Sequence, residues 1–398
     1  MKQRYYSLDV FRGASVALMI LVNNPGSGKY IYAPLEHAPW HGCTPTDLVF
    51  PFFLFAVGNA LAFVMPSLEN KTKSDVIYKI LKRTVLIFLI GLFLNWSPFV
   101  KWSGDQLVFK HWVDPIDPNS GIRILGVLQR IALCYGFGAL IIYFFKLRGA
   151  FVASGVLLLG YWAACIIGNP ADPFSIKGWF GTAFDQSVLG VSHMYKGEGF
   201  PFEPEGLMST FPAIVQVIFG YFVGHYIVSS SKNEIKGPNF QMITHLLLAA
   251  VILTTTAYIW DFSFPINKKI WTSSYVLHTT GLALALLSLL IYFIEFRGSR
   301  GWWSRFFEVF GKNPLFIFVL SALLVRILAL LRWTDHTDES GKPVYSSPLP
   351  WFYQHICKPL GDLTNNPKNG SLLYAICLVA FMWLIVWWMD KKKIYVKV

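Results

Sequence analysis

The segment between the first two apolar runs carries side chains that an acyl transfer would need. Asn23 and Asn24 end the first run, and His37 and His41 follow in the sequence EHAPWHG. An imidazole can act as a general base near neutral pH, and amide N–H groups can stabilise the negative oxygen that forms when a carbonyl is attacked. The polar neighbours of His37 favour catalysis there, whereas a hydrogen-bonded loop role is favoured for His41. The structural alternative for the two asparagines is that they end a helix.

The spacing of His37 and His41, with Glu36 next to the first of them, also suggests a zinc-binding pattern. Zinc ligands at this spacing must share one face of a helical turn. Pro39 lies between the two histidines and prevents that turn, and no third ligand is evident. We therefore expect no metal at this site.

These residues must be positioned by helices in a lipid bilayer. Of the 398 residues, 54% are hydrophobic and only 14% are charged, whereas a soluble protein has about 25% charged residues. The basic residues that give a net charge of +12 gather next to apolar runs, which favours membrane topology over a nucleic-acid partner. Windows of about 20 apolar residues predict an all-α integral membrane protein with ten spans, at 8–24, 46–65, 77–95, 122–145, 150–168, 207–228, 239–260, 271–294, 313–332 and 371–389.

The connections between these spans predict the orientation of the chain. Alternate connections are short and rich in Lys and Arg, and the others are longer and rich in Pro, Gly, Trp and acidic residues. The positive-inside rule then places both termini in the cytoplasm and the protein in the cytoplasmic (inner) membrane. We expect one membrane domain, 1–398. Cys43 and Cys357 both fall in outer loops, so a disulfide and two free thiols both remain open.

Several charged residues lie within or next to the predicted spans. Arg130 follows Arg123 by seven residues, so both point to nearly the same side of a helix. Arg130 would lie about 12 Å deep at 1.5 Å per residue, where an arginine costs about 3 kcal/mol unless it faces a polar cavity or a carboxylate such as Asp47. A structural ion pair and a substrate role are equally supported. Asp9 and Arg12 could pair with each other or meet an anionic ligand from the cytoplasm.

Three further polar segments begin predicted spans. EPEGLMST (Glu203–Thr210) and NKKIWTSS (Asn267–Ser274) begin the sixth and eighth spans on the outer side. GKNP (Gly311–Pro314) begins the ninth span on the cytoplasmic side. A helix N-terminus with cations nearby could hold phosphates there, although the positive-inside rule alone also accounts for those cations.

The chain resembles the bacterial relatives of heparan-alpha-glucosaminide N-acetyltransferase in segments that occur in order along most of its length. The resemblance implies a transmembrane acyltransferase fold and a homodimer. It also implies that acetyl-CoA binds from the cytoplasmic side and that its acetyl group passes to a glucosamine amine on the far side. The catalytic His falls on His37 and its Asn partner on Asn23. The matching segments are SLDVFRG (Ser7–Gly13), LMILVNNPG (Leu18–Gly26), LEHAPWHGCTPTDLVFPFFLFAVG (Leu35–Gly58), LQRIALCY (Leu128–Tyr135), EPEGLMSTFPAI (Glu203–Ile214), NKKIWTSSY (Asn267–Tyr275) and GKNPLFIFV (Gly311–Val319).

Together the residues and the resemblance predict an acetyltransferase with an amino-sugar acceptor. His37 either takes a proton from the incoming amine or carries the acetyl group itself, with Asn23 as the oxyanion donor. The alternative is an amino-sugar (N-acetylglucosamine) transporter or uptake factor, a label that some bacterial relatives carry. The residues predicted to bind the acceptor are Asn24, Glu36, Trp40, Asp47, Arg130, Glu205, Asn267, Lys268 and Trp271, and those predicted to bind acetyl-CoA are Asp9, Arg12, Arg305, Lys312 and Asn313.

Overall fold

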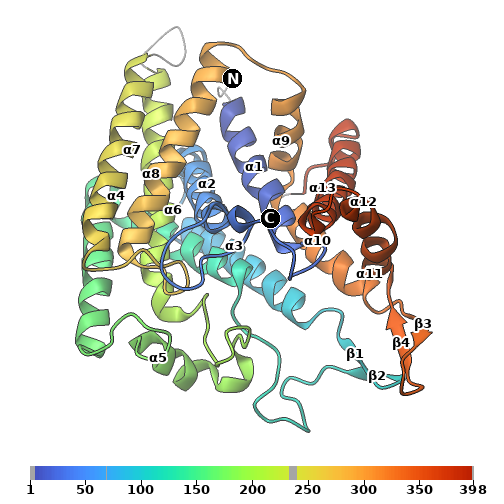
Figure 1. The fold of residues 1–398 in the computed structure, drawn as a ribbon. Helices are drawn as coiled ribbons and strands as arrows, with labels where there is room; N and C mark the ends of the chain where they lie inside the picture. Colours follow the sequence, from blue (N-terminus) through green and yellow to red (C-terminus); the bar gives the residue numbers. More distant parts are fainter. Residues whose placement is uncertain (1–4, 69, 233–239, 397–398) are drawn as a thin grey trace.

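The computed structural model describes residues 5–68, 70–232 and 240–396 and consists mainly of helices packed side by side (Figure 1). Two small antiparallel hairpins, β1 (Val100–Ser103) with β2 (Gln106–Phe109) and β3 (Trp333–Thr337) with β4 (Pro343–Ser346), lie in loops that were expected to be irregular. The helices are α1 (Tyr6–Asn23), α2 (Val49–Val64), α3 (Lys73–Trp96), α4 (Val127–Gly168), α5 (Phe180–Leu189), α6 (Leu207–Lys232), α7 (Phe240–Asp261), α8 (Ser273–Leu290), α9 (Trp302–Lys312), α10 (Pro314–Leu328), α11 (Pro348–Phe352), α12 (Lys358–Asp362) and α13 (Pro367–Lys391).

The protein is a multi-pass membrane protein. Within the described residues, 7 helices are long and apolar enough to cross a membrane, or 8 if α9 and α10, which meet at 81°, form one broken span. Each of the ten predicted spans overlaps a helix, although ends such as 122–126 and 329–332 lie outside the helices and position 239 lies outside the described residues. Ten spans were predicted, but fewer of the described helices are long and apolar enough, for two reasons. Helix α3 begins with a charged stretch, and the predicted spans 122–145 and 150–168 both fall in α4. Helix α4 begins only at Val127, so Arg123 precedes it.

Helix α4 is folded back on itself. Lys146 has a φ of 57° and a ψ of −166° inside it, which interrupts the helical path. Arg130 and Tyr161 would lie about 45 Å apart along a straight helix, yet their side chains interact electrostatically. The two halves of α4 therefore run antiparallel, as two spans joined at Lys146. Figure 1 shows α5 and the two hairpins at the end of the bundle opposite the N-terminus.

Glycines let two pairs of helices approach until their backbones touch. A Cβ at Gly13 of α1 would lie 1.7 Å from the carbonyl oxygen of Phe307 in α9, and a Cβ at Gly311 would lie 2.0 Å from the carbonyl oxygen of Asp9. A Cβ at Gly58 of α2 would meet the backbone of α6 at 2.0 Å. Small residues at such crossings are typical of membrane helices. The glycines of SLDVFRG and GKNP thus hold α1 against α9.

Gly13→Ala is expected to destabilise the protein by about 2 kcal/mol, because α1 and α9 must separate to admit the methyl group. Thermal unfolding in detergent should show a lower midpoint. The matched control is Gly155→Ala in α4, where an added Cβ would have nothing within 4 Å. Alanine favours a helix more than glycine does, so this control should unfold at the same or a higher temperature. Equal midpoints for Gly13→Ala and the unaltered protein would contradict the close approach.

Candidate functional site

The loop between α1 and α2 holds His37 against a buried carboxylate. A 3-10 turn, Pro45–Leu48, precedes α2, and its Asp47 is only 1% exposed. Asp47 Oδ2 accepts hydrogen bonds from the backbone N–H groups of Ala38 and Thr44, each at 3.0 Å. Its other oxygen, Oδ1, lies 2.7 Å from His37 Nδ1. The turn therefore fixes the carboxylate, and the carboxylate fixes the imidazole.

This pairing determines which nitrogen of His37 is available for chemistry. A carboxylate accepts hydrogen bonds, so Asp47 selects the tautomer with the proton on Nδ1 and leaves Nε2 as the acceptor. Lys268 Nζ lies 3.2 Å from Asp47 Oδ1, to which it donates. It also lies 3.0 Å from His37 Nδ1, which cannot accept from it while that nitrogen carries the proton. Burial lowers the pKa of Lys268, and Asp47 opposes that effect without cancelling it. The contact between Asp47 and His37 Nδ1 has the geometry of the carboxylate–imidazole pair in a Ser-His-Asp triad.

A cavity of about 240 Å³ opens beside His37 and Asp47. Its apolar wall comes from the C-terminal end of α1 and the N-terminal ends of α2 and α4, and it includes Met19, about one turn before Asn23. Five polar residues that were not predicted as site residues also line it, namely Thr46, Arg123, Tyr195, Glu198 and Lys269. The predicted residues that line it are Asn23, His37, Trp40, Asp47, Glu205, Lys268 and Trp271.

Three residues predicted to bind the acceptor have other contacts. Asn24 donates its side-chain N–H to the carbonyl oxygen of Ile20 at 2.7 Å, which is the helix-ending role considered above. Glu36 is exposed and does not line the cavity. Asn267 is fully buried, and its Oδ1 accepts from the backbone of Ile270 at 3.1 Å. Asn24 and Asn267 therefore support the loops around the cavity.

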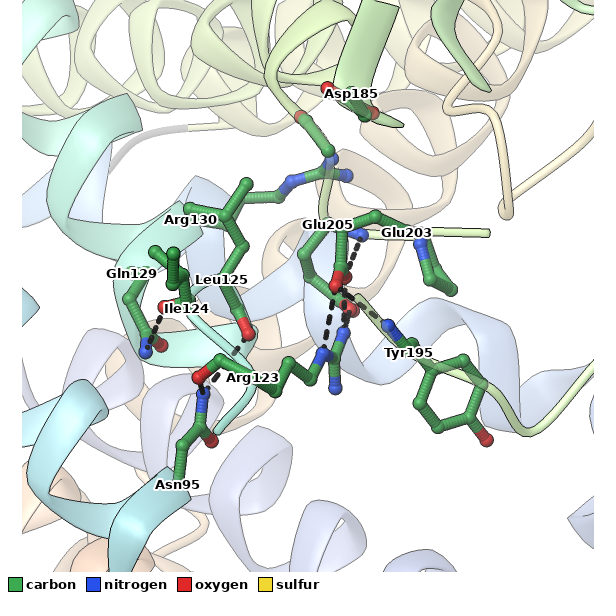
Figure 2. A network of polar contacts seen from close by, with 12 residues as sticks. Asn95, Arg123, Ile124, Leu125, Gln129, Arg130, Asp185, Tyr195, Glu203 and Glu205 are labelled. Atoms are coloured by element: carbon green, nitrogen blue, oxygen red, sulfur yellow. Dashed lines mark hydrogen bonds and ion pairs between the residues drawn. The ribbon is translucent and has the colours of Figure 1, made fainter. Parts of the chain in front are cut away.

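An arginine with two glutamates forms one side of the cavity (Figure 2). Arg123 Nε donates to Glu203 Oε2 at 2.9 Å, and its Nη2 bonds both Glu203 and Glu205. The side-chain N–H of Asn95 in α3 donates to the carbonyl oxygen of Arg123 at 2.9 Å and so holds this segment against α3. Burial lowers the pKa of Arg123, but the two carboxylates outweigh it and raise that pKa. Tyr195 covers the guanidinium, whose centre lies 4.9 Å from the ring centroid.

Arg130 lies next to this cluster. A pairing with Asp47 was predicted, but Arg130 makes other contacts. It is fully buried, with Nη2 donating to the carbonyl oxygen of Gly206 at 3.0 Å and to Ser209. Its guanidinium lies 5.0 Å from the ring centroid of Trp271. Figure 2 shows Asp185 on the far side of Arg130 from Arg123.

Asp185 also holds the turn before α6, which carries Glu203, Glu205 and Gly206. Its Oδ1 accepts from the N–H of Leu207, the first residue of α6, at 2.9 Å. Burial raises the pKa of Asp185 to about 7. Asp185 is therefore partly protonated at neutral pH and adds less negative charge near Glu203 and Glu205. Arg123 already balances part of the charge of these two glutamates. The start of α6, and with it Glu205, is thereby held in place.

The residues predicted to bind acetyl-CoA lie together around α1 and α9, away from His37. Arg12 Nη2 lies 3.4 Å from Asp9 Oδ1, and Arg12 Nη1 donates to the carbonyl oxygen of Gly311 at 3.2 Å. This is the pairing considered as the simpler alternative. A cavity of about 20 Å³ lies beside Arg12, which is room for about one water molecule.

The other three members of this group tie α9 to α13 and the C-terminal segment. Lys312 Nζ lies 2.7 Å from Glu308 and 3.0 Å from Asp390, and Arg305 contacts the same two carboxylates. The side chain of Asn313 exchanges hydrogen bonds of 3.0 and 2.8 Å with the backbone near the C-terminus. The sequence indicated the cations but not their acidic partners. Asp390 is 78 positions from Lys312 and 85 positions from Arg305.

Cysteines and metal-ligating groups add no chemistry to the described part of the chain. All five cysteines are free thiols there, including Cys43 and Cys357. Burial raises the pKa of Cys43 to about 12 and that of Cys357 to about 11, so both remain protonated at neutral pH. Among the residues described, no group of three or more His, Cys, Asp or Glu could hold a metal ion.

Comparison with known proteins gives two matches of different extent. Residues 4–102 match a family model described as "Domain of unknown function (DUF5009)". Over 445 residues the chain is 26% identical to heparan-alpha-glucosaminide N-acetyltransferase of Homo sapiens, which covers 99% of this chain and 60% of that protein. Over 389 residues it is 26% identical to the protein of the same name in Mus musculus, which covers 85% of this chain and 56% of that protein. The chain is a distant relative of these proteins and spans less than two thirds of their length.

Proposed function

We propose that this chain is a membrane acetyltransferase that moves the acetyl group of cytoplasmic acetyl-CoA to the amine of a glucosamine-type sugar on the outer side of the cytoplasmic membrane. The observation that carries the proposal is the contact of 2.7 Å between His37 and the buried Asp47 at the wall of a cavity. The distant relationship to an N-acetyltransferase gives the reaction class. Both termini lie in the cytoplasm, and the protein acts as a homodimer.

His37 and Asn23 carry out the transfer. His37 Nε2 takes a proton from the acceptor amine while the amine nitrogen attacks the thioester carbonyl. The side-chain N–H of Asn23, which lines the same cavity, stabilises the oxyanion. The C–N bond forms, the C–S bond breaks, and His37 returns the proton to the departing sulfur. A variant of this scheme, in which Nε2 first carries the acetyl group, uses the same residues and would give an acetylated protein before the acceptor is added.

Acidic and aromatic residues of the cavity bind the amino sugar. Glu205 and Glu198 provide negative charge that attracts the ammonium form of the acceptor, which releases one proton to solvent to give the attacking amine. Trp40 and Trp271 provide faces against which a sugar ring packs. Lys269 holds Glu198 at 2.6 Å and also donates to the carbonyl oxygen of Pro39 at 2.8 Å, so it fixes Glu198 against the loop that carries His37. At the inner end, Arg12, Arg305, Lys312 and Asn313 bind the phosphates of acetyl-CoA, in exchange for part of their present contacts.

The test is transfer across a sealed bilayer. Proteoliposomes that contain glucosamine receive acetyl-labelled acetyl-CoA on the outside, and N-acetylglucosamine is measured in the lumen. Labelled lumenal product that is absent from protein-free vesicles is the expected result. A second measurement uses labelled glucosamine and no acetyl-CoA. Uptake of this sugar, together with no acetylated product in the first measurement, would contradict the proposal in favour of a transporter.

A further inference from the structure

A second cavity, of about 370 Å³, lies near the catalytic cavity and has no role in the scheme above. Val325 and Ala329 line it from the end of α10, and Tyr353 and Gln354 line it from the turn after α11. Its other lining residues are Pro25, Gly26, Ser27, Ser347, Leu349, Pro350 and Tyr374. All of these described side chains are uncharged, so the cavity suits an apolar group with a few neutral polar atoms.

The segment that closes this cavity has the pattern of a helix lying at a membrane surface. Tyr353, Cys357 and Gly361, spaced by four residues, are buried. On an adjacent face Ile356 is 42% exposed and Leu360 51% exposed. Exposed apolar side chains in a row along a short helical segment are typical of contact with the lipid interface. Figure 1 shows α11 and α12 beside α10 and α13 at the edge of the bundle. With the orientation proposed above, the second cavity faces the outer leaflet.

The two cavities are neighbours along the chain that follows Asn23. A cavity of about 20 Å³ shares the lining residue Val22 with the catalytic cavity and Pro25 with the second one. Asn23 lines the catalytic cavity and Gly26 the second one, and the backbone between these two residues spans at most about 11 Å. A ligand that occupies both cavities must therefore pass Val22 and Pro25.

We propose that the second cavity binds the apolar aglycone of the acceptor, so that the acceptor is a glucosamine glycoside with an alkyl chain, presented from the outer leaflet. This inference rests on the proposed function. The sugar amine lies at His37, the glycosidic end passes Val22 and Pro25, and the chain enters between α10 and α11. A hydrophilic polysaccharide would leave this uncharged cavity unused, whereas an alkyl chain buries apolar surface in it.

The test compares glucosamine with n-octyl glucosaminide as acceptors of labelled acetyl. Burial of even two methylene groups corresponds to about tenfold in binding, so KM for the octyl glycoside should be at least about tenfold lower. Ala329→Trp fills the second cavity and should remove this advantage while glucosamine acetylation continues. Ala329→Leu, a smaller change, should reduce it in part and guards against misfolding of the first variant.

The control is Ala163→Trp, the same change at an exposed position of α4. It should keep the advantage of the octyl glycoside, because simple partitioning of the acceptor into the membrane is the same for every variant. An equal KM for the two acceptors, or an advantage that persists in both Ala329 variants, would overturn the inference. Absence of any glucosamine acetylation would instead contradict the proposed function.

Discussion

His37→Ala is expected to lower kcat/KM for acetyl transfer by about 10²- to 10⁴-fold, which is the range that a general base contributes. His37 is the imidazole that the described cavity presents next to a buried carboxylate, with Nδ1 2.7 Å from Asp47. The side chain is 49% exposed, so its removal should leave the fold intact. Initial rates with acetyl-labelled acetyl-CoA and glucosamine, measured for purified protein in proteoliposomes, give the ratio directly.

The matched control for this variant is His41→Ala. His41 lies four residues later in the same loop and contacts Asn267 at 3.4 Å, but it does not line the cavity. Its variant should retain most of the activity. Equal rates for His37→Ala and the unaltered protein would remove His37 from the mechanism. An equal loss in both variants would indicate that the loop, and not the imidazole of His37, is what matters.

Asp47→Asn is expected to lower kcat by about 10²- to 10⁴-fold with a smaller change in KM. The amide can no longer accept hydrogen bonds at both of its positions, so His37 loses the partner that keeps the proton on Nδ1. Lys268 also loses the charge that it pairs with at 3.2 Å. The acceptor is bound mainly by other groups, which is why the loss should fall on kcat. Separate kcat and KM values for both substrates test this.

The control for Asp47→Asn is Asp117→Asn, an exposed aspartate in an outer loop. It carries the same loss of charge on the same side of the bundle and should leave both constants unchanged. A large rise in KM for Asp47→Asn, with kcat unaltered, would contradict the positioning role. That outcome would assign Asp47 to acceptor binding.

The sequence predicted the helices well, for a physical reason. Spans are set by local hydrophobicity, because each must be apolar along about 20 residues. His37 and Asn23 remain predicted site residues, chosen because Asn23 ends the first span and His37 lies in the polar loop that follows it. The folding back of α4 at Lys146 agrees with two separate predicted spans, 122–145 and 150–168.

Pairings across the sequence could not be predicted in the same way. Arg130 was expected to meet Asp47, but it bonds Gly206 and Ser209, 76 and 79 positions away. That choice depends on how α5 and the turn before α6 pack against α4, which no local pattern encodes. The two-strand hairpins were missed for a related reason, since short exposed strands carry little periodicity.

The residues around α1 and α9 that were predicted to bind acetyl-CoA show that one motif can have two explanations. GKNP was considered as a phosphate-binding helix start, yet its glycine is required by the approach of α9 to α1. Lys312 is neutralised by Glu308 and Asp390 within 3.0 Å. These acidic partners lie on other turns or another helix, so a count of nearby cations alone overstated the positive charge.

The contact between Gly13 and α9 has a consequence for the far side of the bilayer. Gly13 and Asn23 belong to the same helix, ten residues or about 15 Å apart along its axis. Because α1 packs against α9 at Gly13, the distance from that contact to the Asn23 amide is set by the length of a rigid helix. Changes in the loops around the cavity can alter its shape, but they cannot shift this amide along the helix axis.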